Sequence, residues 1–202
     1  MSVVSYPRLL LIPGSSGVWN GRPPSSFRID LQAHLETLLQ THSLRLPSSY
    51  SALACSARQA NVEHVIATAR HAAQIWVGHS EGAARLLHAL QKPRAASRLK
   101  ALVLISPAYA ITSVGAVDVD AAVATLEKHN VRVLLVDTEH GFAGSNAKYK
   151  WPSTRGKLAK AMRLNPNWHS TVVEQSYHSL RHGQAQAALY TIVHWIQTCN
   201  SS

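Results

Sequence analysis

The chain has 202 residues, of which 46% are hydrophobic and 15% are charged, a balance typical of one globular domain with a sizeable core. These values exclude a disordered chain. Lysine and arginine number 20 against 10 acidic residues, and the formal net charge of +10 favours anionic substrates or partners.

Short apolar runs alternate with amphipathic segments along the whole chain. The first run, at 9–12, is closed by Pro13 and Gly14 and predicts a strand buried on both faces. The segment at 27–40 repeats its apolar residues at helical spacing. In chain order, strands are predicted at 9–12, 43–46 (a weak one), 74–77, 99–105, 131–136 and 171–173. Helices are predicted at 27–40, 61–73 with Asn61 as N-cap, 83–90, 118–129, 153–164 and 182–197.

This alternation predicts an α/β fold: a three-layer sandwich with a mostly parallel six-stranded sheet and helices on both faces. Right-handed crossovers and a switch point near the first and third strands favour the strand order 2-1-3-4-5-6. No repeat or linker interrupts residues 1–202, so we expect a single domain with little or no lid. In such sheets, chemistry is expected in the loops at the carboxyl ends of the strands.

The sequence Gly-His-Ser-Glu-Gly at 78–82 stands between the third strand and the helix after it. A nucleophilic serine needs this context, because a sharp strand-to-helix turn holds its hydroxyl above the sheet edge. Small residues at Gly78 and Gly82 let the strand, turn and helix approach closely. Ser80 is therefore predicted to be a nucleophile. The alternative interpretation is that its hydroxyl only caps the helix.

A serine hydroxyl becomes a good nucleophile when a base takes its proton and an acid orients that base. The last strand is followed by His178, the candidate base, and the fifth by two carboxylates, Asp137 and Glu139. Either carboxylate can orient a histidine. We favour Asp137, with Glu139 as the alternative. If neither reaches His178, the expectation is a weaker dyad or an inactive enzyme.

At these positions the chain resembles the α/β-hydrolase family in a small form with little or no lid. The resemblance rests on residues 13–17 after the first strand, 78–82 after the third and 177–179 after the last, and it covers nearly the whole chain as strand-and-helix order. It implies that Ser80 is the nucleophile and His178 the general base, and that the backbone N–H groups of Ser15 and Glu81 form the oxyanion hole. The acid departs from the family pattern, which usually places it a few residues past the fifth strand.

His79, within the motif, and Tyr109, after the fourth strand, are predicted to line the substrate site. Residues 106–117 are the expected pocket wall. His178 and His182 have a spacing that can hold a metal on a helix, but no third ligand has suitable spacing, so we predict no metal and no cofactor.

These residues predict a serine hydrolase that cleaves a carboxylic ester, thioester or related acyl bond. The expected substrate is a small acyl compound, and the positive charge of the chain would favour an anionic one. The competing hypothesis is a hydrolase-fold binding protein, inactive or weakly active. It would use the basic, aromatic stretch 148–163 to bind a nucleic acid or a protein.

The sequence also bears on where the chain resides. Its two cysteines, Cys55 and Cys199, are far apart and lack metal-ligand spacing, which is typical of a reducing compartment. No signal peptide and no apolar run long enough to span a membrane is apparent. The expected localisation is cytoplasmic.

Overall fold

The fold is given by a computed structural model. It describes residues 8–12, 14, 33, 35–37, 55–69, 73–108, 110–111, 115–139, 152–174, 180 and 184–200.

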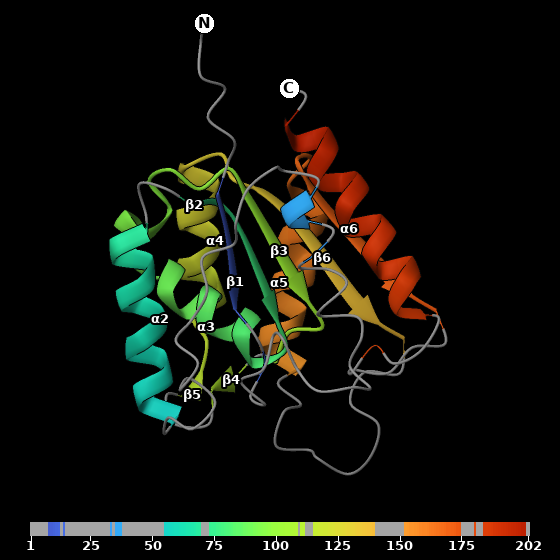
Figure 1. Cartoon of the computed structure of the whole chain (residues 1–202). Coiled ribbons are helices and arrows are strands. Elements are labelled where there is room, and N and C mark those ends of the chain that lie inside the picture. Colours follow the sequence, from blue (N-terminus) through green and yellow to red (C-terminus); the bar gives the residue numbers. More distant parts are fainter. Residues whose placement is uncertain are drawn as a thin grey trace, which may run out of the picture.

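A parallel sheet runs through the centre of the molecule (Figure 1). Its strands are β1 (Arg8–Ile12), β2 (Ala73–His79), β3 (Ala101–Ile105), β6 (Arg132–Thr138) and β7 (Trp168–Val173), in the order β1-β2-β3-β6-β7. All neighbouring pairs are parallel. The predicted order is confirmed for these five strands. The predicted strand at 43–46 lies outside the described residues.

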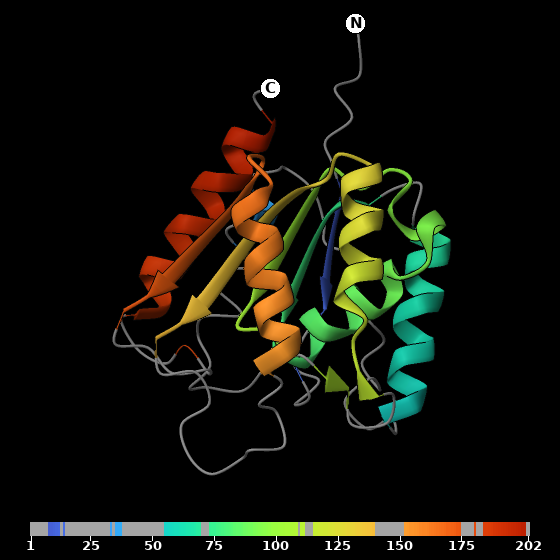
Figure 2. The same ribbon diagram turned by 180° about the vertical axis from the view of Figure 1, so that it is seen from behind.

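Helices cover both faces of the sheet (Figures 1 and 2). One face carries α2 (Cys55–Ala69), α3 (Glu81–Leu90), α4 (Val119–Lys128) and α5 (Pro152–Leu164). The other carries α6 (Gln184–Asn200) and the helical residues 33 and 35–37, among which Leu35 is buried. A short 3-10 helix, η2 (Pro93–Ala96), follows α3. The predicted three-layer α/β class is therefore confirmed.

The alternation of side chains along each strand divides the core into two clusters. In β2, Trp76 packs on the α2–α5 face, whereas Ile75 and Val77 pack on the α6 face. Every side chain of β3 is buried. A strand buried on both faces needs a continuous apolar run, which is why this strand was recognisable from sequence.

Several boundaries differ from the predictions. Helix α2 begins at Cys55, so Asn61 lies inside the helix and is not its N-cap. Strand β6 extends through Asp137 and Thr138, and β7 begins at Trp168, earlier than expected. The strand β7 lies at one end of the described sheet order, and its polar residues His169 and Ser170 are exposed. Exposed polar residues interrupt the apolar run by which a strand is recognised.

Residues after β3 form a small element that the sequence did not predict. The two-residue strands β4 (Ala110–Ile111) and β5 (Gly115–Ala116) pair antiparallel as a separate ladder, with β4 beside α3. They fall within the expected pocket wall at 106–117. Of the helices in the described ranges, none combines the length and the apolar character that a membrane span requires.

Candidate active site

Ser80 occupies a strained turn between β2 and α3. Its backbone has φ 56° and ψ −121°, and its hydroxyl makes no hydrogen bond that caps α3. A residue other than glycine at positive φ stores about 1–3 kcal/mol of strain, and such strain concentrates at functional sites. Ser80 stands at the N-cap position of α3, but its hydroxyl does not make the capping hydrogen bond that the alternative interpretation requires. Its backbone N–H donates to the carbonyl of Ile105 at 2.9 Å, which ties the turn to β3.

Two glycines make room for this turn. A Cβ atom on Gly78 would lie 2.7 Å from the Cα atom of Ala83 and 2.9 Å from Cδ1 of Leu86. The close packing of β2 on α3 therefore requires glycine at this position. A Cβ on Gly14 would lie 3.1 Å from Cβ and 3.5 Å from Oγ of Ser80. The chain after β1 thus passes directly against the candidate nucleophile.

Further hydrogen bonds join the carboxyl ends of the strands around Ser80. The carbonyl of Ser80 accepts from the backbone N–H of Ala108 at 3.0 Å. The N–H of Ser106 donates to the carbonyl of Val136 at 2.7 Å, and the hydroxyls of Ser106 and Thr138 lie 3.3 Å apart. Both hydroxyl groups belong to buried residues. These hydrogen bonds therefore hold the carboxyl ends of β2, β3 and β6 together at the candidate site.

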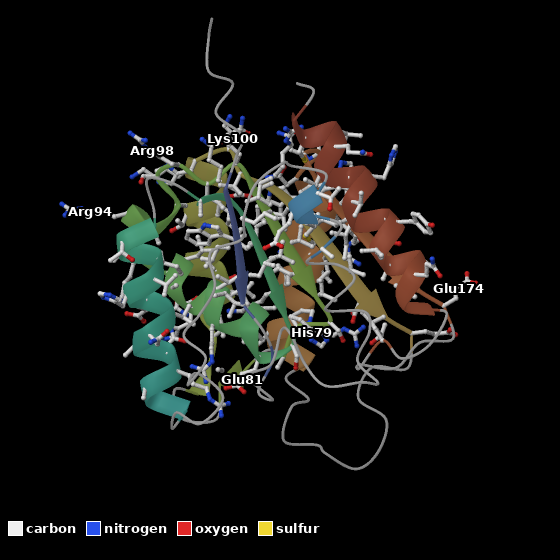
Figure 3. All side chains as sticks on the ribbon, viewed as in Figure 1. His79, Glu81, Arg94, Arg98, Lys100 and Glu174 are labelled. Atoms are coloured by element: carbon white, nitrogen blue, oxygen red, sulfur yellow. The ribbon has the colours of Figure 1, made fainter. Side chains whose placement is uncertain are left out.

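His79 and Glu81 flank the candidate nucleophile and are both buried. Figure 3 shows them at the end of the sheet where the strands terminate, with Glu174 at the same end beyond β7. By strand alternation, His79 projects toward the α6 face. The carboxylate of Glu81 pairs with the guanidinium of Arg85, one helical turn along α3. As the first residue of α3, Glu81 also presents its backbone N–H at the positive end of the helix dipole.

The two candidate acids have different surroundings. Asp137 lies in β6, and its Oδ2 accepts from Nη2 of Arg155 in α5 at 2.7 Å, while Oδ1 accepts from the N–H of Thr138. Glu139 lies in the turn after β6, exposed, and its N–H donates to the carbonyl of Val173 at the end of β7. Asp137 therefore faces α5, whereas Glu139 is bonded to the strand that leads toward His178.

The structure describes five of the eight candidate site residues, namely Ser80, His79, Glu81, Asp137 and Glu139, and it places all of them at the carboxyl ends of β2 and β6. Ser15, Tyr109 and His178 lie outside the described residues. The sequence did not predict that Arg155 pairs with Asp137 or that Arg85 pairs with Glu81. The second pair has the spacing i, i+4 of helical ion pairs, and that spacing is visible in the sequence.

The basic residues are spread over the molecule, and many of those described lie away from this edge. Exposed Arg94, Arg98 and Lys100 lie separately toward the opposite end of the molecule (Figure 3). Within the described part of the basic stretch, Arg155 pairs with Asp137, and Lys157 pairs with Asp120. A nucleic-acid or protein partner for 148–163 stays a prediction. The described ranges contain no cluster of three or more His, Cys, Asp or Glu residues that could hold a metal.

No protein-family model matches the chain, and no curated protein matches it in sequence. Solved structures do match. Est1E from Butyrivibrio proteoclasticus superposes with a TM-score of 0.65 at 12% identity, over 98% of this chain and 90% of that one. A protein of Xanthomonas campestris pv. campestris described as a hydrolase of the alpha/beta superfamily superposes with a TM-score of 0.63 at 17% identity, over 95% of this chain and 99% of that one. The esterase domain of a Rhodothermus marinus protein superposes with a TM-score of 0.58 at 12% identity, over 96% of this chain and 88% of that one. The chain therefore has the α/β-hydrolase fold.

Proposed function

We propose that the protein is a serine hydrolase that cleaves a carboxylic ester, thioester or related acyl bond through an acyl-enzyme intermediate. The observation that carries this proposal is the backbone of Ser80: a non-glycine residue at φ 56° in a strand-to-helix turn, with no capping bond from its hydroxyl. The structural likeness to an esterase domain and to a protein described as a hydrolase of the alpha/beta superfamily supports the general class of hydrolase.

In the proposed first step, Ser80 Oγ attacks the carbonyl carbon of the substrate while the imidazole of His178 accepts the hydroxyl proton. The negative charge that develops on the carbonyl oxygen is held by the backbone N–H groups of Glu81 and Ser15. The tetrahedral intermediate then collapses, and the bond to the leaving alcohol or thiol breaks. His178 returns the proton to the leaving group, and the acyl group stays on Ser80.

In the second step, water attacks the acyl-enzyme and gives its proton to His178. Collapse of this second tetrahedral intermediate breaks the bond to Ser80 Oγ and releases the carboxylic acid. The serine recovers its proton from His178. Apart from water, the two proposed steps use only groups of the chain, and the positive net charge favours substrates that carry a negative group.

A short-chain nitrophenyl ester tests this proposal. Because an acyl-enzyme forms before it is hydrolysed, we expect a burst of nitrophenol of about one equivalent per chain whenever deacylation is the slower step. Acetate, butyrate and octanoate esters would then rank the acyl length that the pocket accepts. Hydrolysis no faster than that of the Ser80→Ala variant would instead favour the hydrolase-fold binding protein.

We further propose Glu139 as the acid that orients His178, in preference to Asp137. Two contacts support this choice: Asp137 is bound by Arg155, and the N–H of Glu139 donates to Val173, five residues before His178. Glu139→Gln is expected to lower kcat by about 10²–10⁴-fold, since the base loses its orienting charge. Asp137→Asn should keep kcat within about fivefold, because it removes only a partner of the largely exposed Arg155.

The comparison is made on the same ester, with Arg155→Gln as the matched variant for the Asp137 pair. If Asp137→Asn loses most of the rate while Glu139→Gln keeps it, Asp137 is the acid. If both variants keep the rate, neither carboxylate orients His178.

A further inference from the structure

A buried ion pair is formed by Glu81, whose backbone N–H is a proposed oxyanion donor. Glu81 is 7% exposed and Arg85 is 1% exposed, and Nη2 of Arg85 donates to Oε1 of Glu81. Glu81 follows Ser80 in the chain, so its carboxylate and its backbone N–H belong to the same residue of the first turn of α3. Figure 3 shows the position of Glu81 at the site end of the molecule.

Stability alone does not explain this pair. Moving two charges out of water costs free energy that their attraction often does not recover, and a pair of apolar side chains of similar volume usually stabilises a core as well or better. The neighbouring residues of α3, among them Ala83, Ala84 and Leu86, are apolar and buried, so both charges are held largely out of water. The position of the pair beside Ser80 points instead to a role in the reaction.

The carboxylate of Glu81 poses an electrostatic problem for the proposed chemistry. The oxyanion would form next to the N–H of Glu81, and an uncompensated negative charge on that residue would oppose it, most strongly in a site shielded from water. The guanidinium of Arg85 neutralises this charge. Arg85 lies one turn further along α3, so the contact fixes the carboxylate of Glu81 to the next turn of the helix.

The same arginine connects α3 to α2. Its Nη1 donates to Oε1 of Gln59 at 3.4 Å, and Nε2 of Gln59 donates to Oε1 of Glu63 at 3.0 Å. Nε2 of Gln59 also lies 3.2 Å from Nδ1 of His88, and the carboxylate of Glu63 is bound by Lys92. These contacts cross from α3 to α2 and back. They fix the first turn of α3, where Glu81 lies, against a second helix.

The charges of Glu63 and His88 are set by the groups around them. Burial alone would raise the pKa of Glu63, but the hydrogen bonds from Lys92 and Gln59 and the charge of Lys92 hold that pKa below its usual value. Burial lowers the pKa of His88, against the opposing attraction of Glu63. At neutral pH, Glu63 is therefore ionised and His88 is mainly neutral. A carboxylate at Glu63 and a cation at Arg85 fix the amide of Gln59 with its NH₂ toward Glu63 and its oxygen toward Arg85.

We propose that Arg85 is a positioning residue of the oxyanion site: it neutralises the carboxylate of Glu81 and holds the first turn of α3 against α2 through Gln59. This role rests on the proposed function, because it concerns the N–H of Glu81 in the hydrolysis of an acyl bond. Arg85 itself does not contact the substrate.

The test compares Arg85→Met with the double variant Glu81→Gln/Arg85→Met. Methionine removes the guanidinium and leaves the charge of Glu81 uncompensated, so we expect kcat on a nitrophenyl ester to fall about 10–100-fold with KM within about threefold. The rate of labelling by a fluorophosphonate should fall by a similar factor. In the double variant, a neutral amide replaces the carboxylate, and we expect kcat to return to within about threefold of the wild-type value.

Lys157→Met is the matched control. It also removes the cation of an ion pair, with Asp120, but that pair is exposed and joins α4 to α5. Its kcat should equal that of the wild type. Melting curves of every variant establish that rates are compared on folded protein, so that a kcat loss is separated from a loss of stability.

Five outcomes decide the proposal. A folded Arg85→Met variant with wild-type kcat overturns the positioning role, and so does a double variant as slow as Arg85→Met. If Arg85→Met does not fold, Arg85→Gln decides, because glutamine keeps a polar side chain but removes the charge that neutralises Glu81: a kcat loss of about 3–10-fold supports the role, and an unchanged kcat overturns it. Wild-type protein that neither hydrolyses the ester nor reacts with the fluorophosphonate refutes the proposed function, and the positioning role with it.

Discussion

Replacing Ser80 by alanine is expected to lower kcat on a nitrophenyl ester by about four orders of magnitude or more, because acyl transfer then lacks its nucleophile. The fold should persist, since the hydroxyl of Ser80 does not cap α3. Steady-state hydrolysis measures the first effect, and circular dichroism checks the second. Activity that survives this substitution would exclude Ser80 as the nucleophile.

Replacing Ser80 by glycine separates activity from strain. Glycine adopts φ 56° without the steric cost that a Cβ atom brings, so the variant recovers part of the about 1–3 kcal/mol stored in the turn. After subtraction of glycine's greater loss of backbone entropy, a net gain of about 1 kcal/mol remains, which corresponds to about 2–4 °C in melting temperature. We expect a more stable and inactive protein. A lower melting temperature would mean that the turn of the native protein is not strained.

The second large effect is expected at Gly78, where replacement by alanine should destabilise the protein strongly. The added Cβ atom would lie 2.7 Å from Cα and 2.8 Å from N of Ala83, and these are backbone atoms of a buried helix that cannot rotate away. Overpacking of a core typically costs about 1–3 kcal/mol, and the backbone contact places this variant at about 3 kcal/mol or more. The melting temperature should then fall by about 6–12 °C.

Gly156→Ala provides the control for this substitution. Gly156 is exposed in α5, and a Cβ atom there would meet nothing within 4 Å. Alanine favours a helix interior over glycine by about 1 kcal/mol, so this variant should melt slightly above the wild type. Equal melting temperatures for the Gly78 and Gly156 variants would contradict the tight packing of β2 on α3.

The sequence predicted the central strands because each is buried on both faces. The apolar runs within β1, β3 and β6 identify strands whose side chains pack against helices above and below. Where an element is partly exposed, the pattern weakens. Strand β7 carries exposed polar residues, and β4 and β5 are only two residues each, too short for any periodicity to appear.

The sequence predicted where the candidate site lies in the fold, but not which side chains contact each other there. Gly78 and Ser80 are recognisable because a strand-to-helix turn of this kind needs a particular local sequence. The partner of Asp137 is not, because Arg155 is distant in the sequence and meets Asp137 only after α5 packs beside β6. Side-chain pairing between elements depends on register and helix rotation. A single sequence does not specify either.

The role of Ser80 as nucleophile is tested by reaction of the folded protein with a fluorophosphonate, followed by mass analysis of its peptides. The reagent modifies serines that are activated by a base, so we expect one adduct per chain, located on Ser80. We also expect no adduct in Ser80→Ala and an unchanged adduct in Ser15→Ala. Folded wild-type protein that stays unmodified, or an adduct on a serine other than Ser80, would contradict the assignment of Ser80 as the nucleophile of a serine hydrolase.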